Sequence, residues 1–252
     1  MHSTLLALTG SILLGLIAPA HQPNPATVPI IQDGDEPRHL EKVEAARRHA
    51  YPLLMIGDSI INILEFPEYK SVWDQYYSPL DALNLGFSGA RTENILWNLT
   101  HGELDGQSPK VVVLLIGSNN SDDANFPTAH TPEQIAEGTK AIIKLIQDRC
   151  PEAKILLLHM FPRGKIVLNP DGTERGDHRR SQATVMRASE ICAKLADNRR
   201  VFFLDVHRQF LRPDGSIDQN LMPDLLHPSP EGARLWAEAM HPLLVKLLGK
   251  SE

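Results

Sequence analysis

Five short apolar runs are spaced along the chain, and longer segments of mixed character separate them. The runs lie at residues 53–56, 82–85, 111–116, 155–159 and 201–205. Each is apolar at nearly every position, which is typical of strands that are buried on both faces of a sheet. The pattern therefore predicts five buried strands.

The segments between the runs have the spacing of amphipathic helices. They cover residues 92–101, 132–149, 180–197 and 230–248. Two of them begin with clear signals, Thr-Pro-Glu at 131–133 and Ser-Pro-Glu at 229–231, in which an N-cap residue precedes a proline and a first-turn acid. Strands that alternate with helices form a parallel sheet with right-handed crossovers. We therefore expect an α/β domain with helices on both faces of the sheet.

The first 20 residues have the pattern of a secretory signal peptide. An apolar span from Leu5 to Ala20 is too short to cross a bilayer comfortably, and it closes on Ala-Pro-Ala, a small-x-small cleavage pattern. We expect a secreted or periplasmic protein with no stable membrane insertion after processing. Because His2 stands where leaders usually carry Lys or Arg, an uncleaved membrane anchor is the alternative. Residues 21–37 are rich in proline and polar side chains and are predicted as a linker, and residues 38–252 as the folded domain.

Composition narrows the range of partners. The chain has 252 residues, 42% of them hydrophobic, which is enough for one large α/β core. Its formal net charge of -6 gives no general attraction to phosphate backbones, so no nucleic-acid partner is expected. The two cysteines, Cys150 and Cys192, lack metal-binding spacing, and they could form a disulfide in an exported protein or remain buried free thiols.

Glycine and polar residues follow three of the predicted strands. The first run ends in Gly57, Asp58 and Ser59, the second in the sequence NLGFSGA, and the third in IGSNN, which includes Gly117. Such residues are ordinary turn formers, so a plain turn is one interpretation. In parallel sheets, however, ligands bind at the carboxyl ends of the strands, where these three turns would meet. The positions therefore predict a functional crevice, in which Asp58 holds the loop and Ser59 is placed to react.

A serine becomes a nucleophile only when a base accepts its proton and a third group orients that base. The C-terminal sequence MPDLLHPSPEG supplies Asp224 and His227 three positions apart, and the flanking Pro223 and Pro228 disfavour a helix. Taken alone, His227 could be a polar residue ahead of a helix cap. Together with Ser59, the pair indicates a candidate catalytic triad.

Ester hydrolysis also needs donors for the negative oxygen of its tetrahedral intermediate. Gly86 can bring its backbone N–H close to a ligand because it has no Cβ, and Asn119 can offer a side-chain N–H. The alternatives are a tight turn at Gly86 and an Asx-turn at Asn119.

Four sequence blocks resemble, in order, the motif blocks of the SGNH/GDSL hydrolases. They are Gly57-Asp58-Ser59-Ile60, Gly86, Gly117-Ser118-Asn119-Asn120 and Asp224-Leu225-Leu226-His227. The resemblance extends over residues 50–245 and implies a flavodoxin-like three-layer sandwich with a five-stranded parallel sheet. Ile60 stands where the family name expects Leu, and Asn120 where many members have Asp. Neither departure removes a catalytic atom.

The resemblance also implies a role for each matching residue. Ser59 would be the nucleophile, His227 the base and Asp224 the acid that orients it. The backbone N–H groups of Ser59 and Gly86 and the side chain of Asn119 would form the oxyanion hole. It implies an esterase that uses no cofactor and no metal.

Longer phrases, such as GARTENILWNLTHGEL, resemble the catalytic subunits of intracellular platelet-activating-factor acetylhydrolase. That similarity implies removal of acetyl or other short acyl groups from a small ester, and it makes a homodimer worth testing. The resembling subunits are intracellular, whereas the leader predicts export. The substrate is therefore left open between an acetylated carbohydrate and a lipid ester, with a phospholipid-directed acetylhydrolase as the enzymatic alternative.

Motifs of other functional classes are absent from the sequence. No G-x-S-x-G elbow surrounds Ser59, no G-x-G-x-x-G follows the first strand, and no G-K-[ST] phosphate loop occurs. A non-catalytic domain that binds an acylated glycan is the alternative from another class, although it would not need the full catalytic set.

Several further residues invite a functional interpretation, and each has a plainer alternative. The segment 169–180 carries Asp171, Glu174, Asp177 and His178 but matches no EF-hand or zinc signature, so we interpret it as a solvated loop. Asn98 and Asn119 begin formal glycosylation sequons. Leu96 and Trp97 could line an acyl pocket, although packing in the helix core is the simpler interpretation.

Overall fold

A five-stranded parallel sheet forms the centre of the computed structural model, which describes residues 22–122, 126, 128–164, 167–168, 174–175 and 182–250. Its strands are β1 (Leu53–Gly57), β2 (Ala82–Gly86), β3 (Val111–Leu115), β4 (Lys154–Leu158) and β7 (Val201–Leu204). Their order across the sheet is β2-β1-β3-β4-β7. The predicted α/β class and parallel sheet are thereby confirmed, and every strand boundary lies within one residue of its prediction. A separate antiparallel pair, β5 (Val167–Leu168) and β6 (Glu174–Arg175), was not predicted.

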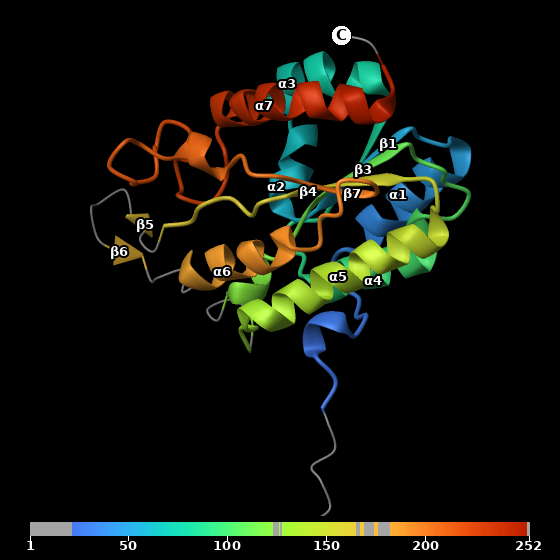
Figure 1. Cartoon of the computed structure of the whole chain (residues 1–252), viewed down its shortest axis with the longest axis horizontal. Coiled ribbons are helices and arrows are strands. Elements are labelled where there is room, and N and C mark those ends of the chain that lie inside the picture. The colour runs from blue at the N-terminus through green and yellow to red at the C-terminus, as the bar shows by residue number, and fades with distance from the viewer. Residues whose placement is uncertain are drawn as a thin grey trace, which may run out of the picture.

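Helices cover both faces of the sheet, so the domain has three layers (Figure 1). One layer contains α2 (Ser59–Asn62), α3 (Lys70–Tyr76) and α7 (Pro230–Leu248). The other contains α1 (Glu36–Arg48), α4 (Thr92–Asn98), α5 (Pro132–Arg149) and α6 (Gln182–Ala193).

Alternate residues of each central strand point into two separate cores. In β1, Met55 packs in the same cluster as Trp236 of α7, whereas Ile56 packs with Ile142 of α5. All four side chains are fully buried. Burial on both faces explains why the strands are apolar throughout.

The predicted helix boundaries hold where capping residues mark them. Thr131 and Gln134 form a reciprocal capping box at the start of α5, and the Ser229 side chain accepts a hydrogen bond from the Gly232 N–H at the start of α7. The helix predicted over 92–101 ends earlier, because His101 and Gly102 have non-helical backbone angles and Gly102 has φ +117°. The start predicted at 180 for the third helix lies outside the described residues.

The helix α1 and the shorter helices α2 and α3 were not predicted. Only Val43 and Ala46 of α1 are buried apolar residues, which is too few to give a clear periodic signal, and α2 spans a single turn.

The segment predicted as a linker differs from the prediction, because its described part packs against the domain. Ala26 is fully buried, and its carbonyl accepts a 2.8 Å hydrogen bond from the Thr92 hydroxyl. The Asn24 side chain donates to the Gln134 carbonyl, and the Ile30 N–H donates to the Glu93 carbonyl. A proline-rich strip can pack in this way when neighbouring helices satisfy its polar backbone, which composition alone does not reveal.

The predicted signal peptide lies outside the described residues. In the part of the chain that the structure does describe, we find no helix with the length and apolar character needed to cross a bilayer. Cys150 and Cys192 are both buried free thiols, which resolves the alternative left open by the sequence.

Candidate active site

Ser59 lies at the first position of α2, directly after strand β1. Gly57 ends the strand in contact with β3, and a Cβ on it would lie 2.2 Å from the Leu115 carbonyl oxygen, so only glycine fits. The Asp58 side chain caps α2 by accepting a 3.0 Å hydrogen bond from the Ile60 N–H. Asp58 thus holds the loop, and the N–H of Ser59 belongs to the first turn, where helices provide no acceptor.

His227 and Asp224 lie in the loop that precedes α7, and the loop brings them to Ser59. Nε2 of His227 is 2.8 Å from Oγ of Ser59, across 168 positions of sequence. Nδ1 of His227 is 2.7 Å from Oδ2 of Asp224. Oδ1 of Asp224 also accepts hydrogen bonds from the backbone N–H groups of Leu226 and His227. The three predicted residues therefore form one continuous hydrogen-bonded chain.

Three contacts from distant elements fix this loop. The Tyr69 hydroxyl donates to the Pro228 carbonyl at 2.8 Å, and the Gly164 N–H donates to the Leu225 carbonyl at 3.0 Å. A Cβ on Gly164 would lie 2.5 Å from a methyl group of Leu225, so the two segments are in close contact. Leu225 itself has φ +60°, an uncommon angle for a side chain of this size, which the surrounding packing must hold in place.

The electrostatics of the pair keep Asp224 ionised. Burial opposes its charge, but hydrogen bonds from the side chain and backbone of His227, together with the Leu226 N–H, outweigh that effect and lower the pKa of Asp224 to about 2. At neutral pH the carboxylate therefore attracts the Nδ1 proton of His227. The lone pair of Nε2 is then left to accept the proton of the Ser59 hydroxyl.

Asn119 begins a short 3-10 turn after β3, and its side chain is 2% exposed. One of its amide hydrogens is donated to the Ala90 carbonyl at 2.9 Å, which fixes the side chain beside the β2–α4 loop. The preceding Gly117 has φ +117°, and a Cβ there would lie 2.8 Å from Ile135. No acceptor for the other amide hydrogen of Asn119 is found among the described residues.

The side chain of Asn120 points in a different direction from that of Asn119 and connects the 3-10 turn after β3 to α4. Its Oδ1 accepts the Thr92 N–H at 3.0 Å, and its amide group reaches the Glu93 carboxylate and Nδ1 of His130, both at 2.9 Å. Asn120 is fully buried. It therefore positions Asn119 without facing the reaction centre.

The predicted role of Gly86 does not match the structure. Its N–H donates to Oδ1 of Asn84 at 2.9 Å, and its carbonyl accepts from Nε of Arg38 at 2.7 Å. A Cβ on Gly86 would lie 2.4 Å from the Asn62 nitrogen, so this glycine allows α2 to pack against β2. Its amide is therefore already occupied within the fold.

Gly89, three residues further along, is the residue that the sequence interpretation missed. It has φ +82°, in the left-handed region, and it lies next to Ala90, whose carbonyl binds Asn119. Among the described residues, none accepts the Gly89 N–H. The signal was present in the sequence, since NLGFSGA contains two glycines, but only the conformation tells them apart.

The other candidate residues are not brought to this site. Leu96 is buried in the core on the α5 side, and Trp97 stacks on His101 with ring centroids 4.0 Å apart. The side chains of both sequon asparagines, Asn98 and Asn119, are buried, which is incompatible with glycosylation of the folded protein. The acidic segment predicted as a solvated loop lies outside the described side chains.

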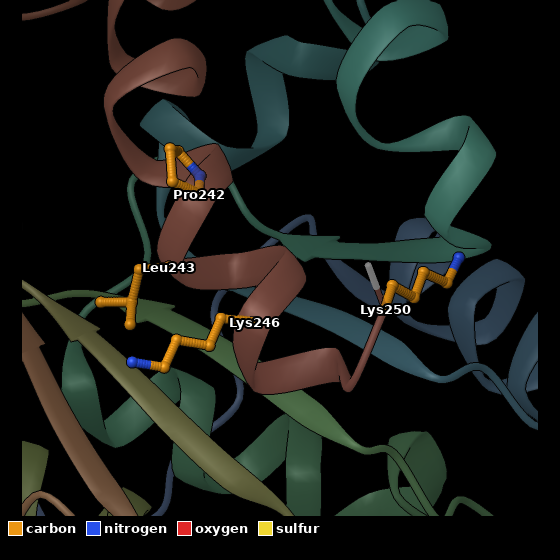
Figure 2. A pocket seen from close by; sticks show the side chains of 4 residues that line it. All are labelled: Pro242, Leu243, Lys246 and Lys250. Atoms are coloured by element: carbon orange, nitrogen blue, oxygen red, sulfur yellow. The ribbon is translucent and has the colours of Figure 1, made fainter. Parts of the chain in front are cut away.

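A hollow beside α7 and a cluster of two histidines and one aspartate lie away from Ser59. Pro242, Leu243, Lys246 and Lys250 line a hollow near the C-terminal end of α7, about 20 Å along the helix from its catalytic-loop end, and the two lysines point away from each other (Figure 2). Within the described residues, one trio could hold a metal ion: His159, Asp205 and His207, whose ligand atoms lie within 4.8 Å of one another.

Comparisons with known proteins identify the family of the chain. The model of the GDSL-like lipase/acylhydrolase family matches residues 55–235, which include all five predicted site residues. The chain belongs to this family. The chain is also similar to human platelet-activating factor acetylhydrolase IB subunit alpha1, to which it is 35% identical over 200 residues, or 79% of this chain and 78% of the relative. Membership makes the protein an ester hydrolase and confirms the predicted resemblance.

Solved structures show the same GDSL hydrolase fold. A GDSL-like lipase from Bacteroides thetaiotaomicron has a TM-score of 0.64 at 13% identity and covers 82% of this chain and 97% of its own. An acetyl xylan esterase has a TM-score of 0.56 at 21% identity and covers 76% of this chain and 98% of its own. At these identities the likeness supports the fold alone, and the predicted SGNH hydrolase fold with its five-stranded parallel sheet is confirmed.

Proposed function

We propose that this GDSL hydrolase is a serine esterase that removes acetyl or other short acyl groups through Ser59, His227 and Asp224. The observation that carries the proposal is the hydrogen-bonded chain from Asp224 through His227 to Ser59, with 2.7 and 2.8 Å contacts at the two ends of one imidazole. A serine hydroxyl in that position can be deprotonated as it attacks.

The geometry supports a two-step reaction. Oγ of Ser59 attacks the acyl carbon while Nε2 of His227 takes its proton, and the alcohol leaves with that proton as the acyl-serine forms. Water then attacks the acyl group, gives a proton to His227, and releases the carboxylic acid as Ser59 recovers its hydrogen. Asp224 stabilises the imidazolium that exists between these transfers.

We propose that the oxyanion is bound by the N–H of Ser59, the N–H of Gly89 and the side chain of Asn119, with Gly89 in place of the expected Gly86. The support is that the Gly86 amide already donates to Asn84, whereas the Gly89 amide is left without an acceptor among the described residues.

An NMR experiment tests the choice of glycine. After a phosphonate ester reacts with Ser59, its charged oxygen imitates the oxyanion. The Gly89 amide proton should then move strongly downfield while the Gly86 amide proton stays near its original position. The opposite pattern would return Gly86 to the oxyanion hole.

The activity is tested with p-nitrophenyl acetate, butyrate and octanoate, using the purified protein and Ser59→Ala, both checked for folding by circular dichroism. We expect activity on acetate that falls steeply with chain length and is lost in the variant. Equal background rates for the two folded proteins would leave Ser59 without a role, and equal rates on acetate and octanoate would remove the short-acyl preference.

A phospholipid-directed acetylhydrolase is the second candidate, and the 35% identity to a platelet-activating-factor acetylhydrolase subunit favours it. An acetylated carbohydrate is favoured by the export that the N-terminal sequence predicts and by the fold shared with an acetyl xylan esterase. Comparing kcat/KM on a 2-acetyl ether phospholipid and on acetylated xylo-oligosaccharides separates the two. A preference of tenfold or more identifies the class.

Export and homodimer formation remain parts of the proposal. N-terminal sequencing of the protein from its host would show a start near residue 21 if the leader is removed. Light scattering of that same material would distinguish a monomer from a dimer.

A further inference from the structure

A second cluster of reactive side chains lies on the same edge of the sheet, beyond the proposed active site. Residue Leu158 of β4 pairs with Leu204 of β7, and the His159 N–H continues the ladder by donating to the Leu204 carbonyl at 3.0 Å. This register places His159 beside Asp205 and His207, which follow β7. Because β4 lies two strands from β1, the cluster is about 10 Å along the edge from Ser59.

The two imidazoles in this cluster are stacked and buried. Their ring centroids are 4.3 Å apart with an interplanar angle of 18°, and the residues are 6% and 7% exposed. A buried pair of histidines must stay neutral or gain an opposite charge, because two protonated rings at this distance would repel. Within the described part of the chain, the acid that contacts one of these rings is Asp205, whose Oδ1 lies 2.7 Å from Nδ1 of His207.

One of the two rings already has the kind of partner that metal-binding histidines use. Nδ1 of His159 donates to the Met160 carbonyl at 2.6 Å, and a backbone carbonyl in this position orients the Nε2 atom of many metal-binding imidazoles. Nδ1 of His207 lies 2.7 Å from a carboxylate oxygen of Asp205, close enough for the two atoms to share one ion. Among the described residues, none donates a hydrogen bond to Nε2 of His159 or His207.

We propose that His159, His207 and Asp205 bind one divalent transition-metal ion of the zinc type, through Nε2 of His159, Nδ1 of His207 and one carboxylate oxygen of Asp205. The ligand atoms of the three residues lie within 4.8 Å of one another, and a tetrahedral zinc site holds its ligands about 3.3 Å apart, so a small closure completes the site. The exposed Asp205 carboxylate and Nδ1 of His207 would exchange their 2.7 Å hydrogen bond for shared binding of the ion.

The surroundings select the type of metal. His207 lines an open cavity of about 570 Å³ together with Arg208 and Arg212, so ions can reach the cluster from solvent. The neighbouring arginines disfavour cations that bind by charge alone, such as Mg²⁺ and Ca²⁺, which also prefer oxygen ligands. Two imidazoles favour Zn²⁺, Cu²⁺, Ni²⁺ or Co²⁺ instead.

Metal binding at this place would stiffen the frame of the active-site loop. His159 begins the segment that reaches Gly164, whose N–H binds the Leu225 carbonyl in the loop of Asp224 and His227. His207 begins the turn that ends at Phe210, and the Phe210 carbonyl accepts the Asp218 N–H at the start of the same loop. One ion would therefore connect the two segments that support this loop.

The test uses metal-free protein purified without a histidine tag. Zn²⁺ is titrated calorimetrically into the wild type and into His159→Gln, His207→Gln and His49→Gln, with Mg²⁺ as the comparison ion. His49 is the matched control, because it also contacts a carboxylate, Asp81, at 2.6 Å but is half exposed and has no second histidine partner. We expect one Zn²⁺ per chain, with affinity at least tenfold weaker in the first two variants and unchanged in His49→Gln.

A second readout keeps the test decisive if the histidine variants do not fold. Co²⁺ bound by two imidazoles and a carboxylate gives visible absorption bands, which should appear with the wild type and weaken in Asp205→Asn, whose exposed side chain can be changed without disturbing the core. Zn²⁺ should also raise the wild-type melting temperature by several degrees near saturation. No saturable binding to the wild type, or equal binding by Asp205→Asn and His49→Gln, would overturn the proposal.

Discussion

Two aspartate–histidine pairs lie on one edge of the sheet, and they have the same internal geometry. In Asp224–His227 and in Asp205–His207, Nδ1 of the histidine is 2.7 Å from a carboxylate oxygen. The group that contacts the histidine ring besides the carboxylate differs between the two pairs. Nε2 of His227 meets the Ser59 hydroxyl at 2.8 Å, whereas the ring of His207 stacks on His159.

This difference shows that a histidine–carboxylate pair does not determine its own chemistry. In the roles proposed above, the third group decides the chemistry: the Ser59 hydroxyl at Nε2 of His227 suits that pair for proton transfer, and the His159 ring beside His207 suits the other pair for metal binding. A third pair, His49–Asp81, has neither kind of neighbour and lies on the surface. The predictions that follow change one member of this comparison at a time.

Removal of the serine should have the largest effect. Ser59→Ala eliminates the nucleophile, so kcat for p-nitrophenyl acetate should fall by roughly 10⁶-fold, as it does in other triad enzymes. A decrease smaller than tenfold in folded protein would show that Ser59 is not the nucleophile.

Loss of the Asp224 carboxylate should cause the second-largest decrease in kcat. Asp224→Asn keeps the size of the side chain but no longer favours the correct tautomer of His227, and kcat should fall by about 10³- to 10⁴-fold. The rate is measured on the same acetate substrate across pH 5 to 9. An unchanged kcat would mean that the backbone alone orients His227.

Loss of the proposed oxyanion donor Asn119 should cause the third-largest decrease in kcat. Asn119→Ala removes one hydrogen bond that strengthens in the transition state, so kcat should fall by about 10²- to 10³-fold with little change in KM. If KM rises while kcat stays constant, Asn119 contributes to substrate binding instead.

The pH dependence of stability should show a smaller effect. The pKa of Asp224 is lowered to about 2, so its ionised form stabilises the fold above its ordinary pKa near 4, and that contribution is lost as the pH falls from about 4 to about 2. Because its side chain is 47% exposed, solvent screening limits the contribution to about 1 kcal/mol or less. Urea unfolding of the wild type and Asp224→Asn should therefore give curves that converge at low pH, and a constant difference would contradict this origin.

Disruption of the exposed His49–Asp81 pair should have the smallest effect on activity and stability. His49→Gln breaks an exposed contact with Asp81, so activity should stay within about twofold and the free energy of unfolding within about 0.5 kcal/mol. A larger change in the rate would show that a histidine–carboxylate contact matters even without a reactive third group.

Much of the fold was predictable because its signals are local. The apolar run that ends in Gly57 marks a strand, and the Thr131 cap marks the start of a helix, whatever the rest of the chain does. The packed segment around Ala26 could not be predicted, because it depends on contacts with helices that are distant in sequence. Helix α1 could not be predicted because two of its four buried residues are polar, which leaves no clear apolar period. The candidate site was likewise predictable in part. The types and spacing of Asp224 and His227 indicated their roles, but the sequence did not show which glycine amide is free to bind an oxyanion.

The sequence by itself determined the class of the fold, the residues of the proposed triad and the family. Each of these is encoded in short patterns, such as Gly57-Asp58-Ser59, whose meaning does not depend on distant residues. Only the tertiary structure decided that the Gly86 amide is already taken by Asn84 and that His159 lies against His207. The reason is physical: a hydrogen bond or a ring contact depends on distances of a few ångströms, and these are set by the strand register and helix packing of the whole domain.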